Sequence, residues 1–171
     1  KLHDFRAAER SFAQVVRLVP EDAMARKNHG AALRDLGRLA EARAELERAL
    51  RLDPMCADAY HALGLLESKL GDAEAALGMH RSAVEIDPGH ADALNQIGVI
   101  LARSGNAEEA AAHFERAVAS RPAHVTARFN LSEAHRVLGR ADLAAAELER
   151  VVALQAKHPR AHAKLAEIYS A

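Results

Sequence analysis

Apolar residues recur along this chain with the spacing of a helix face rather than of a strand. In stretches such as LGLLESKLG and IGVILARSG they lie three or four positions apart, as on one side of an α-helix. Each stretch closes on a glycine, which adopts the left-handed conformation that commonly ends a helix. The pattern predicts short amphipathic helices joined by tight turns.

The whole pattern returns every 34 residues. Prolines follow this period at Pro20, Pro54, Pro88 and Pro122. The closing glycines follow it at Gly37, Gly71, Gly105 and Gly139. Further small residues follow it at Gly30, Gly64, Gly98, Ser132 and Ala166, and at Ala8, Ala42, Ala76, Ala110 and Ala144. A period in this range is typical of proteins built from stacked structural repeats.

We number the repeat from 1 to 34 with proline at position 32. The chain then divides into a partial repeat, four full repeats and a final half: 1–22, 23–56, 57–90, 91–124, 125–158 and 159–171. The glycine at position 15 and the proline at position 32 predict two helices in each full repeat. Small residues at positions 8 and 20 let these helices approach closely, and leucine there would cost ~1–3 kcal/mol by overpacking.

A helical wheel separates two arcs on the first helix of each repeat. Positions 3, 4, 7, 8, 10, 11 and 14 lie on the arc expected to be buried. In the third full repeat these residues are Ala93, Leu94, Ile97, Gly98, Ile100, Leu101 and Ser104. Positions 2, 5, 6, 9, 12 and 13 lie on the opposite arc, which is expected to stay open to a ligand.

The pattern resembles the tetratricopeptide repeat family, whose signature is roughly W-x2-L-G-x2-Y, then A-x3-F, A and P. One repeat matches it with Tyr60, Leu63, Gly64, Ala76, Ala83 and Pro88. The next matches it with Leu94, Ile97, Gly98, Leu101, Ala110, Phe114, Ala117 and Pro122. The chain departs from it at His80, Glu67 and His135, which replace aromatic residues. The resemblance implies an all-α, right-handed α-solenoid of antiparallel helix pairs.

The resemblance also implies a protein-interaction scaffold that binds a peptide or partner segment in a concave groove lined by the first helices. The residues expected in this groove are Lys27, Asn28, His61, Leu65, Asn95, Gln96, Val99, Phe129, Asn130, Glu133, Arg136, Arg160 and Lys164. Leu65, Val99 and Phe129 form either an exposed apolar stripe for a ligand or a half-buried contact between neighbouring helices. The amide side chains either bind a peptide backbone or are ordinary solvated surface.

Charge suggests a preference among ligands. Residues 57–124 carry five basic and ten acidic side chains, whereas residues 125–171 carry seven basic and five acidic ones. We therefore expect an acidic ligand segment to be attracted by Asn130, Arg136, Arg160 and Lys164. The chain resembles carboxylate-clamp members of the family only in part, since Asn95 and Val99 stand where the clamp has Lys and Asn.

Composition gives no sign of chemistry. The chain has 40 alanines, only 4% aromatic residues, one cysteine (Cys56) and a net charge of −1, which gives no basic excess for nucleic acid. Its histidines lack a Cys or carboxylate cluster, and no catalytic or phosphate-binding motif occurs, so neither an enzyme, a metal nor a cofactor is expected. No apolar run approaches the ~20 residues of a membrane span.

Two alternatives concern the wider protein. The array is also similar to the repeat regions of O-linked glycosyltransferases and sulfotransferases, although only Asn28 and Asn130 keep the asparagine that lines the glycosyltransferase groove. The first and last partial repeats lack covering neighbours, so we expect either flanking repeats or self-association to form a homo-oligomer. The expected location is cytoplasmic, or periplasmic if a signal peptide has been removed.

Overall fold

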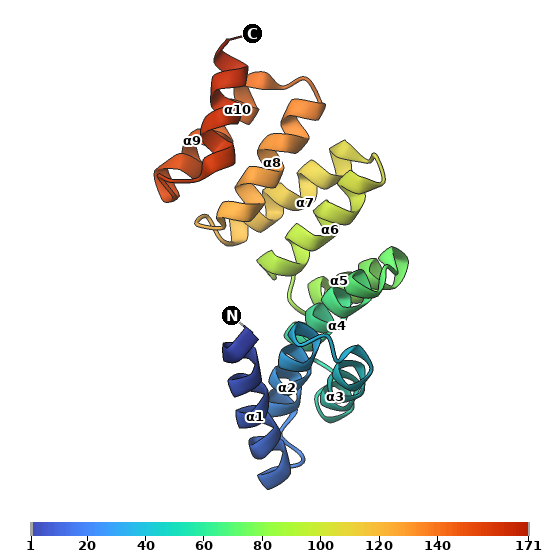
Figure 1. Ribbon diagram of the computed structural model, residues 1–171. Helices are drawn as coiled ribbons and strands as arrows, with labels where there is room; N and C mark the ends of the chain where they lie inside the picture. The colour runs from blue at the N-terminus through green and yellow to red at the C-terminus, as the bar shows by residue number, and fades with distance from the viewer. Residues whose placement is uncertain (1, 171) are drawn as a thin grey trace. The chain divides into compact units, whose positions relative to one another are not determined.

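The computed structural model describes residues 2–170, with side chains from residue 4 onward. Lys1 and Ala171, which limit the two partial repeats, lie outside the described residues. The described chain holds ten α-helices and no strand, which confirms the all-α prediction (Figure 1). The helices are α1 (Leu2–Leu18), α2 (Ala23–Asp35), α3 (Leu39–Leu52), α4 (Ala57–Leu70), α5 (Ala73–Ile86), α6 (Ala91–Arg103), α7 (Ala107–Ser120), α8 (Val125–Val137), α9 (Ala141–Leu154) and α10 (Pro159–Tyr169).

The helices form two compact units, Lys1–Pro88 and Gly89–Ala171. In the first unit α2 packs on α3 and α4 packs on α5, and α1 packs on α2. In the second unit α6 packs on α7 and α8 packs on α9, and α10 packs on α9. Each unit is therefore built from helical hairpins. The division into a single array of 34-residue repeats stays a prediction.

Glycine forms the turn inside each hairpin. Gly37, Gly71, Gly105 and Gly139 have φ angles of 81°, 90°, 85° and 72°. No other residue in the described chain has a positive φ angle. A side chain at these positions would be strained, because the left-handed conformation brings Cβ too close to the backbone. The turn role expected for this glycine series is thus present in all four hairpins.

A second glycine series allows the two helices of a hairpin to touch. A Cβ atom added to Gly30 would lie 2.7 Å from Cγ of Leu46, and one added to Gly98 would lie 2.5 Å from Cε1 of Phe114. The side chain at position 24 of the second helix therefore lies directly over position 8 of the first. Ser132 occupies position 8 of the fourth full repeat and is almost fully buried, so a Cβ atom is accommodated there.

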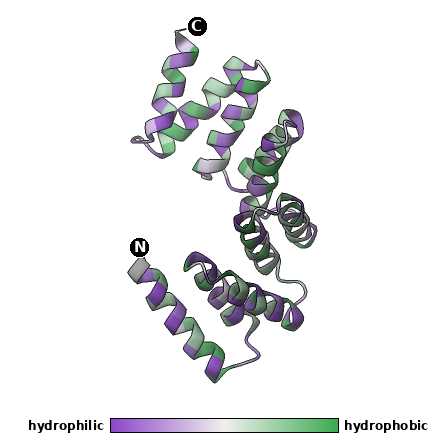
Figure 2. Ribbon diagram, turned by 45° about the vertical axis from the view of Figure 1, so that its right-hand side comes forward, coloured by the Kyte–Doolittle hydropathy of each residue, from purple (hydrophilic) through white to green (hydrophobic). Residues whose placement is uncertain are grey.

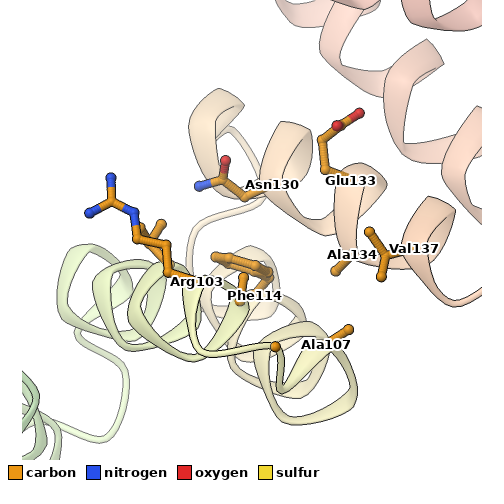
Figure 3. A pocket seen from close by; sticks show the side chains of 10 residues that line it. Arg103, Ala107, Phe114, Asn130, Glu133, Ala134 and Val137 are labelled. Carbon is orange, nitrogen blue, oxygen red and sulfur yellow. The ribbon is translucent and has the colours of Figure 1, made fainter.

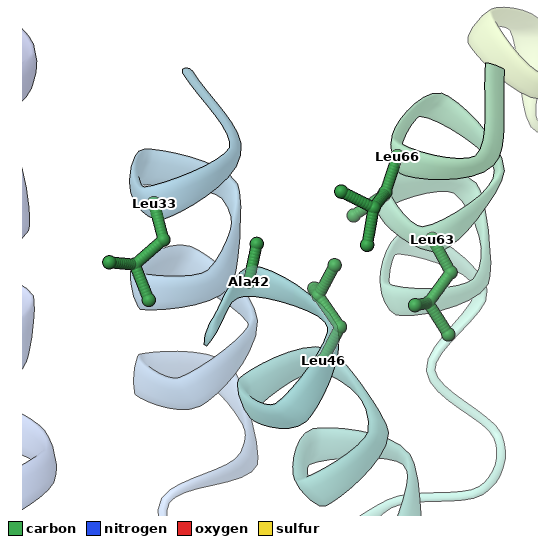
Figure 4. Close-up of a cluster of buried hydrophobic side chains, with 6 residues drawn as sticks. Leu33, Ala42, Leu46, Leu63 and Leu66 are labelled. Carbon is green, nitrogen blue, oxygen red and sulfur yellow. The ribbon is translucent and has the colours of Figure 1, made fainter. Parts of the chain in front are cut away.

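Each unit has its own hydrophobic cluster. In the first unit it comprises Leu33, Ala42, Leu46, Ala62, Leu63 and Leu66, which join α2, α3 and α4 (Figure 4). In the second unit a cluster of Phe129, Leu148, Val151 and Ala161 joins α8, α9 and α10. Apolar and polar residues alternate along the helices (Figure 2), as an amphipathic helix requires.

The helical wheel was wrong at position 14 of the second and third full repeats. Leu70 and Ser104 are exposed, because α4 ends at Leu70 and Ser104 already caps the end of α6. Position 11 is buried in the four full repeats, as the wheel predicts, and in the second full repeat it holds a charged residue, Glu67. Glu67 is accommodated there because Arg43 lies 2.6 Å from its carboxylate.

Candidate interaction site

The second unit contains a cavity of about 300 Å³ between α6, α7 and α8. Val99, Ala102 and Arg103 of α6, Gly105 of the turn, Ala107 and Phe114 of α7, and Asn130, Glu133, Ala134 and Val137 of α8 line it (Figure 3). Its walls are mainly apolar. Three polar side chains, Arg103, Asn130 and Glu133, also border it. Such a combination suits an apolar side chain of a ligand together with a few polar contacts around it.

The amides of Asn95 and Asn130 form a pair beside the cavity. Asn130 Nδ2 donates a hydrogen bond of 2.9 Å to Asn95 Oδ1, joining α6 to α8. Asn95 is only 5% exposed, so the expectation that its position is open to a ligand is wrong. Asn130 remains half-buried and lines the cavity, and Gln96 and Val99 are also half-buried.

Phe129 belongs to the core rather than to an open groove. It is 7% exposed and packs in the cluster between α8, α9 and α10. Its ring centroid lies 5.0 Å from that of His158, and Cζ of Arg160 lies 4.9 Å from the ring centroid. The predicted exposed stripe is therefore wrong at Phe129. Leu65 and Val99 are half-buried, and Val99 lines the cavity.

The basic groups expected to attract an acidic ligand already have neighbours. Arg136 Nη2 lies 3.3 Å from Glu133 Oε2, and Lys164 Nζ lies 2.8 Å from Glu167 Oε2. The hydrogen bond from Lys164, and then its charge, hold the pKa of Glu167 below its usual value, and the charge of Arg136 acts in the same direction. Exposed ion pairs are weak, worth ~0–1 kcal/mol, so a ligand carboxylate could replace these partners.

The predicted groove residues of the first unit are held by neighbours on the same unit. Lys27 Nζ lies 3.4 Å from Asp58 Oδ2, so α2 is linked to α4. His61 Nδ1 lies 3.3 Å from Nδ1 of the buried His80. Asn28 is half-buried and lies with Lys27 on α2.

Sequence reasoning missed a pair that recurs within the hairpins. Arg26 at position 4 lies 2.8 Å from Glu45 at position 23, and Arg128 lies 2.7 Å from Glu147 at the same two positions. Each arginine also donates to the carbonyl at position 32, on Pro20 and Pro122 respectively. The signal was present in the sequence, because the repeats with arginine at position 4 are also those with glutamate at position 23.

Three histidines that could suggest a metal site begin helices instead. His90, His124 and His158 each accept a hydrogen bond at Nδ1 from a backbone N–H three residues later, at 3.1 to 3.2 Å. They satisfy a donor that the first turn of a helix leaves unpaired. No group of three or more potential metal-binding side chains occurs within the described residues.

Three family models of the tetratricopeptide repeat match the chain, over residues 30–71, 56–123 and 95–159. The chain belongs to the tetratricopeptide repeat family. In the repeat numbering, the first-helix residues that line the cavity stand at positions 9, 12 and 13 of one repeat and positions 6, 9, 10 and 13 of the next. None of the helices described here is long and apolar enough to cross a membrane.

Solved structures of other tetratricopeptide repeat proteins show the same fold. MamA is 22% identical over 92% of both chains, with a TM-score of 0.73. A thermophilic member from Thermus thermophilus is 22% identical over 99% of this chain and 93% of its own, with a TM-score of 0.78. YrrB, described as having an unusual peptide-binding site, is 26% identical over 95% of this chain and 84% of its own, with a TM-score of 0.68.

Proposed function

We propose that this protein is a non-catalytic interaction module that binds an extended segment of a partner protein in the cavity of the second unit. The observation that carries the proposal is the cavity itself. It is apolar, has a volume of about 300 Å³ and is bordered by an amide, a carboxylate and a guanidinium group. Members of the tetratricopeptide repeat family are mostly protein-interaction scaffolds, and YrrB is described as having a peptide-binding site.

The chemistry of the lining indicates how a segment would bind. An apolar side chain of the ligand would contact Val99, Phe114 and Val137, and would remove the exposed atoms of Val99 and Val137 from water. Asn130 uses one amide hydrogen for Asn95 and keeps its oxygen and second hydrogen for a peptide backbone. Arg103 has no ion-pair partner among the described residues, so it favours a carboxylate on the ligand.

A peptide-display selection against the chain tests this proposal. Selected peptides are expected to share an apolar residue and to lose affinity about tenfold with Val137→Asp, because truncating or charging a central contact removes ~1–2 kcal/mol. Val137 is exposed, so this substitution leaves the fold intact. Leu143→Asp is the matched control, since Leu143 is also exposed on the second unit but does not line the cavity. Equal losses in both variants, or none in either, would refute the site.

The alternative function is recognition of a substrate or partner on behalf of an enzyme, as in the glycosyltransferases and sulfotransferases that the sequence resembles. Asn130 supports it, because that asparagine stands at position 6 and lines the cavity. The full reading frame of the gene decides between the two functions. A catalytic domain encoded beside these residues would support the alternative, and its absence would support an independent scaffold.

A further inference from the structure

The second unit has another cavity, of about 310 Å³, where the start of α8 meets the end of α9. It shares no lining residue with the cavity between α6, α7 and α8. Two arginines border it, and the other lining residues are apolar. The six residues that line it are Pro122, Ala123, Arg128, Arg150, Ala153 and Leu154.

The two arginines differ in what they already bind. Arg128 Nη1 lies 2.7 Å from Glu147 Oε2, and Arg128 Nε donates a hydrogen bond of 2.7 Å to the carbonyl oxygen of Pro122. These contacts hold the Arg128 side chain in place, and its Nη2 makes no hydrogen bond with the described residues. Arg150 is exposed and forms no ion pair with any residue that the structure describes. Two positive charges thus share one carboxylate, which leaves a surplus positive charge at the cavity.

The segments that form the cavity and continue from it are basic. Residues 121–130 and 150–160 carry five basic side chains and no acidic one. The carboxylates that pair with these arginines come from other segments, Asp92 with Arg121 and Glu147 with Arg128. Positive charge that extends beyond the cavity favours a ligand with several acidic groups over one with a single carboxylate.

Two of the other hairpins lack this arrangement. In α6–α7, position 4 is Leu94 and position 30 is Ser120, whose hydroxyl donates a hydrogen bond to the carbonyl oxygen of Gly89 in the preceding turn. In α4–α5, positions 4 and 26 are Tyr60 and Ser82. Neither hairpin therefore has arginines at both positions.

The α2–α3 hairpin has the same residues as α8–α9 at five of the positions concerned. These residues are Pro20, Arg26, Glu45, Arg48 and Leu52, which correspond to Pro122, Arg128, Glu147, Arg150 and Leu154. The two hairpins differ at position 33, where Glu21 stands in place of Ala123. Glu21 is exposed, and its negative charge opposes the approach of an acidic ligand. The α2–α3 hairpin therefore serves as an internal control for α8–α9.

We propose that the cavity between α8 and α9 binds an acidic side chain of a partner protein segment, with an apolar neighbour of that side chain placed on Leu154. The ligand carboxylate would accept charge-assisted hydrogen bonds from Nη2 of Arg128 and from the guanidinium of Arg150. Leu154 is 47% exposed, so an apolar contact would remove its surface from water. This site does not depend on the function proposed for the other cavity.

The lining favours an acidic peptide over a nucleic acid. No aromatic side chain is among the described residues that line the cavity. Proteins that bind single-stranded nucleic acid commonly stack the bases on aromatic rings. The cavity instead offers aliphatic groups beside two guanidinium groups, which suits a carboxylate next to an apolar side chain.

Fluorescence anisotropy with a labelled peptide of alternating glutamate and leucine residues tests this proposal. The full chain carries Val137→Asp in every measurement, which weakens binding in the other cavity and so separates the two sites. The peptide is expected to bind, to bind more weakly as salt is added, and to lose affinity when its glutamates are replaced by glutamine. No binding of the glutamate peptide, equal binding of the two peptides, or equally tight binding of single-stranded DNA would overturn the proposal.

Charge reversal within the chain tests the location of the site. Arg150→Glu should lower the affinity for the glutamate peptide roughly tenfold, because it removes a charge-assisted hydrogen bond and adds a like charge. Arg48→Glu is the matched control, because Arg48 is exposed at the same position of α3 and the substitution changes the net charge equally. Equal losses in the two variants would show that net charge alone attracts the peptide, and would refute the site, as would an Arg150→Glu variant that binds normally.

A second substitution transfers the difference between the two hairpins. Ala123→Glu gives α8–α9 the glutamate that α2–α3 has at position 33, and it should weaken binding of the glutamate peptide because the added carboxylate repels the ligand. Ala112→Glu is the control, since Ala112 is exposed on α7 but does not line the cavity. Unchanged binding in Ala123→Glu, or an equal loss in Ala112→Glu, would contradict the proposed position of the ligand.

Discussion

The residue before each first helix shows how a single side chain sets a helix start. Asp22 has φ and ψ angles of −81° and 101° and accepts a hydrogen bond from Ala25 N at 2.9 Å. His90 has the same role in its repeat, with ring nitrogen in place of carboxylate oxygen. Cys56 has nearly the same backbone angles, −79° and 92°, but makes no side-chain cap. Among the first helices of the repeats, α4 is therefore the one whose start a substitution can improve.

Cys56→Ser is expected to stabilise the protein by about 1 kcal/mol, because the hydroxyl can accept from Ala59 N as Asp22 accepts from Ala25 N. The measurement is the free energy of unfolding from chemical denaturation. Cys56→Ala is the control, since it removes the thiol without adding an acceptor, and it should give no such gain. If serine and alanine have the same effect, the hydroxyl does not cap α4.

Single residues also mark where prediction from the sequence stops. The turn at Gly105 follows from local chemistry, because only glycine adopts its φ angle of 85° without strain. Asn95 and Phe129 lie on the arc that a helical wheel leaves open, yet both are buried. A helical wheel describes a single helix and contains no information on its neighbours. In the structure α8 covers Asn95 and α10 covers Phe129, and these contacts depend on tertiary packing. Of the residues expected in the groove, Val99, Asn130 and Glu133 line the cavity.

At the scale of helices, the α6–α7 hairpin depends on the size of the residue at the point where the two helices touch. Gly98 of α6 is covered by the ring of Phe114, which is almost fully buried. Helix propensity alone would favour alanine over glycine at this position. At Gly98, packing against Phe114 therefore opposes the higher helix propensity of alanine. Substituting alanine at this glycine and at a second helical glycine measures which of the two effects is larger.

Gly98→Ala is expected to destabilise the protein by ~1–3 kcal/mol, because the new Cβ would lie 2.5 Å from Phe114 Cε1 and must displace the ring. Gly78→Ala is the matched comparison. Gly78 lies within α5 with nothing inside 4 Å of an added Cβ, so alanine should stabilise the protein by about 1 kcal/mol. Denaturant unfolding of both variants measures whether each substitution lowers or raises the free energy of unfolding. A Gly98→Ala variant as stable as the unchanged chain would show that the helices are not in close contact.

At the scale of the whole molecule, the two units bury different kinds of side chain. In the first unit the large apolar residues that are buried are Leu33, Leu46, Leu63 and Leu66. In the second unit they are Leu94, Ile97, Leu101, Phe114, Phe129, Leu131, Leu148 and Val151. The first unit also has His80 at the position that Phe114 fills in the second, so a polar ring replaces an apolar one at the centre of a hairpin.

Burial of apolar area stabilises a fold by ~25 cal/mol per Å², so the unit with more buried apolar side chains should resist opening better. Hydrogen exchange of the intact chain measures this directly, since amide protection reports the free energy of local opening. Amides of α6 to α9 are expected to exchange more slowly than those of α2 to α5. His80→Phe should reduce the difference in amide protection between the two units, provided that the phenylalanine ring fits beside Gly64. The Gly98–Phe114 pair indicates that it does. Equal protection in both units, or faster exchange in the second, would show that buried apolar area does not set their relative stability.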